Sequence, residues 1–295
     1  MRKTVFTGTA TALATPFTKD GIDEKALRHL VDFQIAGGVS ALVACGTTGE
    51  ASTQTKDEWA HTVQIVVEQA KGRVPVIAGT GGNDTADVIL RGRRARELGA
   101  AAQLCVTPYY NKTTQRGLVA HYTAIAEDGS LPVIIYNVPA RTGLSVTAET
   151  IAALSHVDNI IAIKEASANM ILTADILRLC EERIAVYSGT DEVVVPLMSL
   201  GGLGVISVIS NVVPRQMVDL TDAVLSGNYK EAARLQLLLL PLTHALFSEV
   251  NPIPLKAALS IMGFGENIVR LPLVPLSDEN TEKLKQEMKK LGLIP

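Results

Sequence analysis

The fold class that this sequence predicts is α/β, a (β/α)₈ TIM barrel followed by an all-helical C-terminal extension. Eight short apolar runs recur about every 20–35 residues, and each is followed by apolar residues at helical spacing. Eight strand–helix units within about 225 residues match the size of such a barrel. After Gly227 the strand-like runs stop and the remaining patterns are helical.

The predicted strands occupy residues 9–14, 41–45, 74–78, 103–107, 133–137, 160–164, 185–188 and 205–208. The helical segment after the first strand carries Leu27, Leu30 and Val31 on one face. The second helical segment begins with a capping-box pattern, because Thr55 precedes Glu58 by three residues ahead of an apolar run. Strand and helix therefore alternate from the start of the chain.

A doubly wound sheet is the alternative, since it also alternates strands and helices. Its nucleotide-binding form carries a G-x-G-x-x-G turn after the first strand. This chain has no such turn there. The glycine-rich segment at 79–82 follows the third strand and lacks the required spacing, so we interpret it as a tight turn.

The C-terminal part contains three helical patterns, at residues 229–248, 253–262 and 278–291. We expect two units: a catalytic barrel over residues 1–227 and a helical extension over residues 228–295. No low-complexity linker separates them, so the extension is predicted to pack on the barrel.

Composition excludes several function classes. The net charge is −3 and aromatic residues make up 4%, which argues against a nucleic-acid partner. The most apolar segment, residues 235–247, is interrupted by Gln236, Pro241 and His244, so no membrane span is expected. The 3 cysteines are widely separated, and neither a disulfide framework nor a metal site is expected. With no leader segment evident at the N-terminus, we expect a cytoplasmic protein.

The most informative residue is Lys164, which ends the apolar strand 160–164. A low-dielectric interior disfavours a charged amine and lowers its pKa. An ordinary lysine amine is neutral in only about one molecule in 2,500 at pH 7. A pKa of about 7–8 makes roughly a tenth to a half of it nucleophilic, as Schiff-base chemistry requires. The alternative is a strand-end lysine that extends to solvent or forms an ion pair with the adjacent Glu165.

Other polar groups follow the ends of neighbouring strands, which meet at one mouth of a barrel. Gly-Thr-Thr-Gly at 46–49 offers backbone N–H groups and two hydroxyls for a small carboxylate. Tyr136 precedes Lys164 by one repeat and is expected on the neighbouring strand. Arg141 would hold a second carboxylate. The seventh strand ends in Ser-Gly-Thr-Asp at 188–191.

Each of these groups also has a structural interpretation. Gly46 and Gly49 would only shape a turn, Tyr109 would only pack, and Arg141 would pair with a helix carboxylate at the rim. Cys105 has no basic neighbour to lower its pKa and is interpreted as a core residue.

Four motifs in order carry a resemblance to a known family: Gly-Thr-Thr-Gly-Glu at 46–50, Pro-Tyr-Tyr-Asn at 108–111, Tyr-Asn-Val-Pro-x-Arg-Thr-Gly at 136–143 and Ile-Lys-Glu-Ala-Ser at 163–167. The chain resembles the pyruvate-dependent class I (Schiff-base) aldolases, the family that includes N-acetylneuraminate lyase. Within it, the resemblance is to the dihydrodipicolinate synthase branch and covers essentially the whole chain. Members are (β/α)₈ barrels that assemble as tetramers, built as dimers of dimers.

The resemblance implies a lyase that condenses pyruvate with L-aspartate-4-semialdehyde on the diaminopimelate route to lysine. It implies no cofactor and no metal, because Lys164 would form a covalent imine with pyruvate. Tyr136 would be the acid/base group beside it. Thr48 and Tyr110 would complete a proton relay, with Tyr110 entering from a partner subunit.

The resemblance also implies the substrate contacts. Thr47 and Thr48 would hold the pyruvate carboxylate, and Arg141 would bind the semialdehyde carboxylate. Gly189 and Ile206 would line the pocket through backbone groups. Sialic acid lyases and sugar-acid aldolases of the family usually lack the arginine, since their second substrates are polyhydroxylated.

Some relatives bind lysine as an inhibitor at the dimer interface, and Asn83 and Tyr109 match residues of that site. Lys56 and Trp59 stand where regulated relatives carry histidines, and Asp87 replaces a longer glutamate. A cation at position 56 would repel a cationic effector, so we predict weak or absent inhibition by lysine.

Two further functions remain open from the sequence. The chain would act on a sugar-derived keto acid as another aldolase of the family, or would bind a small carboxylate as a catalytically silent sensor.

Overall fold

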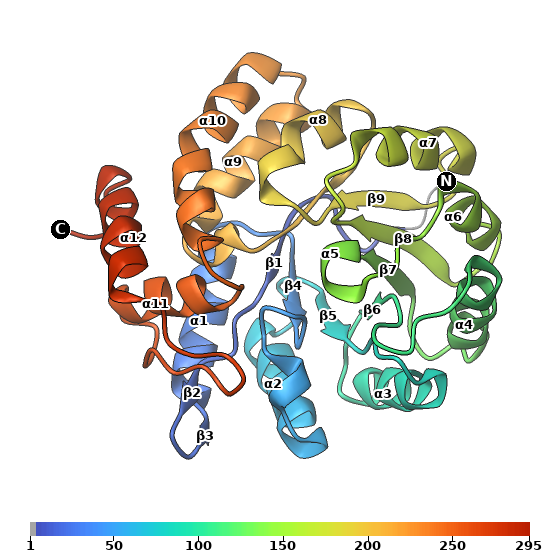
Figure 1. Cartoon of the computed structure of the whole chain (residues 1–295), viewed down its shortest axis with the longest axis horizontal. Helices are drawn as coiled ribbons and strands as arrows, with labels where there is room; N and C mark the ends of the chain where they lie inside the picture. The colour runs from blue at the N-terminus through green and yellow to red at the C-terminus, as the bar shows by residue number, and fades with distance from the viewer. Residues whose placement is uncertain (1–3) are drawn as a thin grey trace.

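The structure, a computed structural model, describes residues 4–295 and contains a closed barrel of eight parallel strands surrounded by helices (Figure 1). The strands are β1 (Gly8–Ala12), β4 (Ala41–Ala44), β5 (Val76–Gly79), β6 (Ala102–Val106), β7 (Val133–Asn137), β8 (Ile160–Glu165), β9 (Ala185–Ser188) and β10 (Gly204–Ser207). Strand β1 pairs with both β4 and β10, which closes the barrel and makes the doubly wound alternative wrong. All eight predicted strands are confirmed, with bounds within two residues.

The helices that cover the barrel are α1 (Glu24–Ala36), α2 (Lys56–Ala70), α3 (Thr85–Glu97), α4 (Gln115–Glu127), α6 (Ala148–Leu154), α7 (Met170–Cys180), α8 (Val194–Ser199) and α9 (Pro214–Leu225). The capping box of α2 is confirmed: Thr55 N donates to Glu58 Oε2 (2.9 Å), and Glu58 N donates to Thr55 Oγ1 (3.2 Å). This reciprocal pair fixes the start of α2 directly after the threonine-rich loop.

Short elements between strands and helices are not predicted by the sequence patterns. They are the hairpin β2 (Phe17–Thr18) with β3 (Gly21–Ile22), the helix α5 (Pro139–Thr142), and the 3₁₀ turns η1 (Ala51–Thr53), η2 (Asp191–Val193) and η3 (Ile209–Asn211). Elements of two to four residues are too short to show a period.

The C-terminal extension consists of α10 (Tyr229–Leu246), α11 (Ile253–Ile261) and α12 (Asp278–Lys290), as predicted to within two residues. Helix α10 packs on α8, α9 and α12, and the extension lies beside α1 (Figure 1). Buried residues of α1, α10, α11 and α12 belong to one apolar cluster. The division of the chain at residues 227 and 228 stays a prediction.

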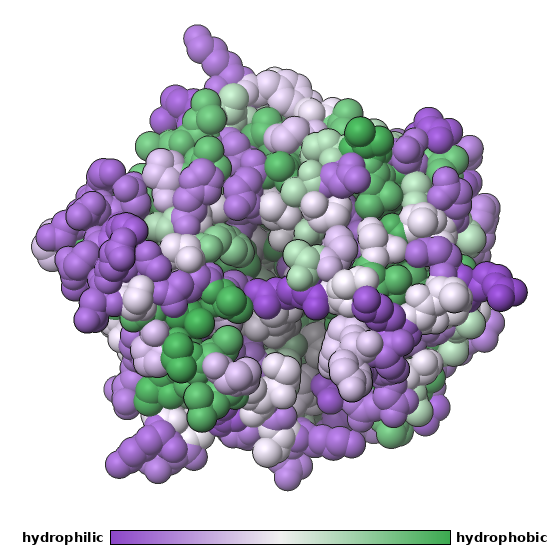
Figure 2. All heavy atoms as spheres, viewed as in Figure 1, coloured by the Kyte–Doolittle hydropathy of each residue, from purple (hydrophilic) through white to green (hydrophobic). Residues whose placement is uncertain are grey.

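The barrel interior is filled by small and branched side chains, among them Ala10, Val43, Ile134 and Ile206. This packing leaves polar groups to gather at the carboxyl ends of the strands. Figure 2 shows the molecule from the side of Figure 1, with a hollow near the centre and hydrophilic residues beside it. Residues 1–3, part of the N-terminal stretch in which no leader segment is expected, lie outside the described residues. None of the helices in residues 4–295 is both long and apolar enough to span a membrane.

Candidate active site

Lys164 and Tyr136 lie side by side at the carboxyl ends of two adjacent strands. They are direct partners in the parallel pairing of β7 with β8, as the spacing of one repeat predicts. The Lys164 Nζ lies 4.4 Å from the centroid of the Tyr136 ring. Their exposed fractions are only 4% and 7%. The prediction that Tyr136 lies on the strand next to that of Lys164 is therefore confirmed.

The Lys164 amine is held in a form that is unusually easy to deprotonate. Burial lowers its pKa from 10.5 to about 8; the negative charge of Asp191 opposes this shift, and the positive charge of Arg141 adds to it. Within residues 4–295, no carboxylate forms an ion pair with Lys164. Glu165 instead accepts hydrogen bonds from Asn137 Nδ2 (2.8 Å) and Ser167 N (2.6 Å). Since Lys164 is also buried, the alternatives of a solvent-exposed lysine and of a Lys164–Glu165 ion pair are both wrong.

Burial raises the pKa of the Tyr136 phenol, and the Arg141 cation and a hydrogen bond with Thr47 act in the opposite direction. The phenol therefore stays protonated at neutral pH, with a hydroxyl as its hydrogen-bond partner. A phenol hydrogen-bonded to a hydroxyl has the chemistry that general acid–base catalysis requires.

A cavity of about 190 Å³ opens over the lysine. The predicted site residues that line it are Thr47, Thr48, Tyr136, Arg141, Lys164 and Gly189. A neighbouring cavity of about 320 Å³ shares part of this lining and adds Tyr109. One space thus brings together an amine, a phenol, two hydroxyls and a guanidinium.

The threonine-rich loop reaches this cavity through a tight turn after β4. Gly49 N donates to the carbonyl of Gly46 (3.1 Å), and Glu50 N donates to the carbonyl of Thr47 (3.0 Å). A Cβ at Gly49 would come within 3.2 Å of the Leu13 carbonyl, so the glycine permits close packing on the barrel. The glycines therefore shape the turn, and the turn places both threonines at the cavity. Binding of a carboxylate by this loop stays a prediction.

Sequence analysis missed Asn251, which the C-terminal extension contributes to the site. Its Nδ2 donates to Thr48 Oγ1 (3.0 Å), and its carbonyl accepts a hydrogen bond from Arg141 Nη2 (3.1 Å). Asn251 is 6% exposed and lines the cavity with Lys164. Its Oδ1 is buried without a hydrogen-bond partner among residues 4–295. Arg141 thus donates to a backbone carbonyl of the extension, and the alternative of a rim pair with a helix carboxylate is wrong.

Asp191 is a second buried acid at this mouth, at the start of η2. Its Oδ2 accepts hydrogen bonds from the backbone N–H groups of Val208 (3.0 Å) and Ile209 (3.1 Å). Burial raises the pKa of this carboxyl, and the hydrogen bonds, including one from Ser207, lower it. The Asp191 charge acts on Lys164 from a fixed position.

Two predicted residues are not brought into these cavities. Tyr110 is 90% exposed and lines neither of them. Ile206 is fully buried in β10, opposite Ala10 of β1. In the described part of the chain, no three potential metal-ligating side chains cluster. Cys105 is fully buried, which raises the pKa of its thiol to about 12, so its interpretation as a core residue is confirmed.

The candidate effector residues Asn83 and Tyr109 do not line the cavity that contains Lys164. Tyr109 is half exposed, and the backbone carbonyl of Asn83 accepts a hydrogen bond from Asn111 Nδ2 (2.9 Å). A small cavity of about 130 Å³ between α2 and α3 is lined by both Lys56 and Asp87. The Asp87 carboxylate there is paired with Lys56 (3.3 Å) and with Arg91 (2.7 Å).

Comparison with known proteins identifies the family. The model of the dihydrodipicolinate synthetase family matches residues 5–291 of this chain. The chain belongs to the dihydrodipicolinate synthetase family. A relative from Trichlorobacter lovleyi, named 4-hydroxy-tetrahydrodipicolinate synthase, is 50% identical over 290 residues, which cover 98% of this chain and 100% of the relative.

Solved structures of the family superpose closely. A chloride-inhibited dihydrodipicolinate synthase from Acinetobacter baumannii in complex with pyruvate gives a TM-score of 0.96 at 41% identity, covering 99% of this chain and 100% of that one. A protein described as the first monomeric dihydrodipicolinate synthase variant gives a TM-score of 0.97 at 43% identity, covering 98% of each chain. The family resemblance expected from the four motifs is confirmed.

Proposed function

We propose that this chain condenses pyruvate with L-aspartate-4-semialdehyde to 4-hydroxy-tetrahydrodipicolinate, in the diaminopimelate pathway of lysine biosynthesis, with Lys164 as the Schiff-base residue. The chain is an enzyme of the 4-hydroxy-tetrahydrodipicolinate synthase class, as its relatives are. The single observation that carries the role of Lys164 is its buried amine, unpaired by any carboxylate within residues 4–295, beside a phenol at the cavity. A cytoplasmic location is proposed with this pathway role.

The chemistry begins when the neutral Nζ of Lys164 attacks the keto carbon of pyruvate. Tyr136 passes a proton to the departing oxygen, and water leaves as the C=N bond forms. The protonated imine withdraws electrons, so the pyruvate methyl loses a proton and an enamine results. The enamine carbon attacks the aldehyde carbon, and the aldehyde oxygen takes up a proton through Tyr136, which replaces the one that the methyl released, and becomes a hydroxyl. The amino group of the semialdehyde then displaces Lys164 from the imine carbon, which closes the ring.

The substrate contacts are proposed from the cavity lining. Thr47 and Thr48 would bind the pyruvate carboxylate, because they present hydroxyls and backbone N–H groups beside Lys164. Arg141 would bind the semialdehyde carboxylate. Gly189 would contribute backbone groups at the cavity wall, and Ile206 would do so from the neighbouring β10.

The proton relay would require a second copy of the chain. Tyr110 is 90% exposed, as a residue that completes a neighbour's site would be in a single subunit. We therefore propose a homo-oligomer, a tetramer built as a dimer of dimers, in which the partner's Tyr110 joins Thr48 and Tyr136. Asn83 and Tyr109 are proposed to mark an effector site near the same surface.

Arg141 separates this reaction from that of a sugar-acid aldolase. A guanidinium suits a short aldehyde that carries a carboxylate, whereas a polyhydroxylated substrate requires neutral hydrogen-bonding groups. Arg141 lines both cavities, and no carboxylate neutralises it within residues 4–295.

The test has two parts. Borohydride reduction in the presence of pyruvate should give a covalent adduct that peptide mapping assigns to Lys164, which a sensor protein would not form. Turnover with pyruvate and aspartate-4-semialdehyde should then exceed cleavage of sugar-derived keto acids. An adduct on another residue, or faster sugar-acid cleavage, would overturn the proposal.

A further inference from the structure

The structure contains a second buried lysine, at the base of the threonine-rich loop. Lys256 lies in α11, and its Nζ is 2.6 Å from Glu50 Oε1. The exposed fractions of the two side chains are 3% and 1%. Glu50 directly follows the Gly-Thr-Thr-Gly turn, so the ion pair joins this turn to the C-terminal extension across 206 residues of sequence.

Glu50 is fixed through both of its carboxylate oxygens. Oε1 accepts the hydrogen bond from Lys256, and Oε2 accepts one from the backbone N–H of Arg270 (2.9 Å). The backbone of Glu50 is left-handed, with φ 52°, a conformation that costs free energy for a residue other than glycine. The extension thus holds the end of the loop in a conformation that the loop does not prefer by itself.

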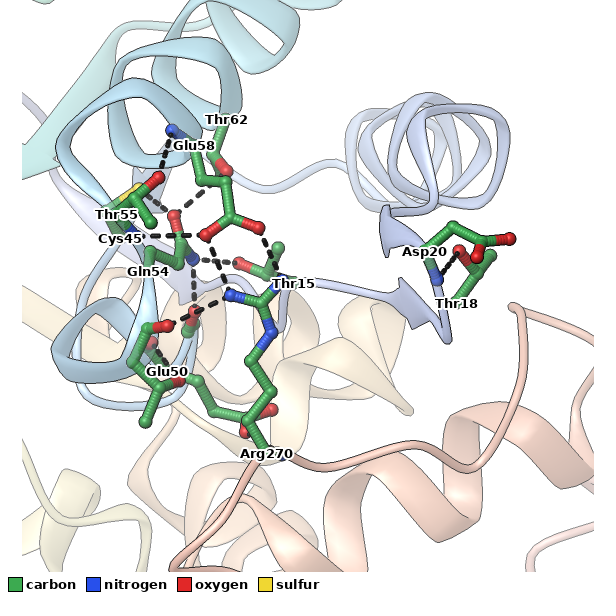
Figure 3. A network of polar contacts seen from close by, with 12 residues as sticks. Thr15, Thr18, Asp20, Cys45, Glu50, Gln54, Thr55, Glu58, Thr62 and Arg270 are labelled. Atoms are coloured by element: carbon green, nitrogen blue, oxygen red, sulfur yellow. Dashed lines mark hydrogen bonds and ion pairs between the residues drawn. The ribbon is translucent and has the colours of Figure 1, made fainter.

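Further hydrogen bonds surround Glu50, and Figure 3 shows those made by Arg270 and Gln54. Arg270 donates to Glu58 Oε2 (2.8 Å) and to the Thr53 carbonyl (2.9 Å). Gln54 Nε2 donates to the Gly49 carbonyl (2.8 Å). Lys256 Nζ also lies 4.1 Å from the centroid of the Phe17 ring, in the β2–β3 hairpin. The carbonyl of Gly49 and the carboxylate of Glu50 are therefore both held by groups outside the barrel strands.

The segment that ends at Lys256 also contacts the threonine-rich loop at its first residue. Asn251, five residues before Lys256, donates to the hydroxyl of Thr48. The segment 251–256 therefore contacts the loop twice, once at a threonine of the cavity and once at the glutamate that ends the turn.

We propose that Lys256 is a positioning residue for the pyruvate-binding loop: by holding Glu50, it sets where Thr47 and Thr48 lie relative to Lys164. This inference rests on the proposed function of the loop. A buried ion pair is a poor source of stability compared with apolar packing, but removal of one partner leaves an uncompensated charge. The arrangement therefore favours one loop conformation over others.

The experiment compares Lys256→Met, Glu50→Gln and the double variant K256M/E50Q with the matched control Glu58→Gln. The control makes the same carboxylate-to-amide change in the same network, but the Glu58 carboxylate is hydrogen-bonded to Thr55 and Arg270 and not to residues 46–50. We expect the Lys256 and Glu50 variants to lower kcat by about 10- to 100-fold, because misplacement of a substrate-binding group by about 1 Å has an effect of this size. The KM for pyruvate should rise, while the KM for the semialdehyde stays close to that of the unmodified enzyme.

A merely structural role would lower the melting temperature and the active fraction without changing the KM for pyruvate. Where a single variant does not fold, the double variant decides, because it leaves no buried unpaired charge. Unchanged kcat and pyruvate KM in the folded double variant, or equal losses in Glu58→Gln, would overturn the inference. Borohydride trapping of pyruvate by the unmodified enzyme distinguishes failure of the proposed function from failure of this inference. No adduct would count against the proposed function, whereas an adduct together with unchanged kinetics of the Lys256 and Glu50 variants would count against the role of Lys256.

Discussion

The two buried lysines among residues 4–295 differ in their partners, and this difference distinguishes a candidate nucleophile from a structural residue. Lys164 and Lys256 are 4% and 3% exposed. Lys256 is 2.6 Å from a carboxylate, whereas Lys164 has no such partner within residues 4–295 and faces a tyrosine ring. Burial lowers the pKa of both amines; at Lys256 the charge and hydrogen bond of Glu50 oppose that shift directly. A buried lysine without a close counterion is more readily neutral and is then available as a nucleophile. A buried lysine paired with a carboxylate stays charged and links two parts of the structure.

The largest expected effect is that of Lys164→Met. It should abolish the borohydride adduct and reduce turnover by about 10³-fold or more, since Lys164 is the single amine among the described residues that line the cavity. The folded-state pKa of about 8 lies below the usual 10.5, so below pH 8 the buried charge opposes folding, and this cost diminishes as pH rises from 8 to 10.5. A pKa decrease of this size corresponds to about 3 kcal/mol at pH 7, so the melting temperature of Lys164→Met should not fall.

Lys256→Met is the contrasting variant in the same assays. It should keep the pyruvate adduct on Lys164 and lose thermal stability, because Glu50 is left buried without its cation. A stable Lys256→Met together with a destabilised Lys164→Met, measured by calorimetry at pH 7, would reverse the comparison and contradict the assignment of roles.

Gly189→Ala should have the next largest effect. A Cβ at this position would lie 2.6 Å from the Ala166 Cβ and 2.9 Å from the Lys164 Cε, so the lysine chain must move. We expect adduct formation to slow by about 100-fold, as for a nucleophile displaced by about 1 Å. Gly82→Ala is the control, since its Cβ would meet only Val88 Cγ2 at an ordinary 3.6 Å. Equal rates in both variants would show that the lysine chain has room to adjust.

The smallest expected effect is that of added lysine. Lys56, Arg91 and Arg94 line the small cavity between α2 and α3, and Asp87 is already paired with two of them. A cationic effector would meet three positive charges and one neutralised carboxylate. Initial rates should be unchanged in millimolar L-lysine, and inhibition at micromolar concentration would refute this expectation.

The barrel was predictable because its strands are apolar runs that end at polar residues. Residues 133–137 and 185–188 have the predicted bounds without change. The pairing of Tyr136 with Lys164 was also predictable, since one repeat separates neighbouring parallel strands. Hydrophobic periodicity thus locates the strand ends and, through them, most of the cavity lining.

The contribution of the extension was not predictable in the same way. Asn251 meets Thr48 across 203 residues, and no local pattern specifies such a contact. One signal was available in the sequence: Lys256 is the single charged residue of α11, whose other positions are mostly apolar. A lone cation in an otherwise apolar helix indicates a buried partner, and Glu50, after the threonine-rich turn, supplies it.

The pH dependence of imine formation tests the central claim most directly. The rate of adduct formation with pyruvate, followed by rapid quenching and intact-protein mass, should rise with pH and level off above a pKa of about 8, because only the neutral amine of Lys164 attacks. The matched variant Lys164→Met should give no adduct at any pH. A rate that continues to rise through pH 10, as for a solvent-exposed lysine, would contradict the account.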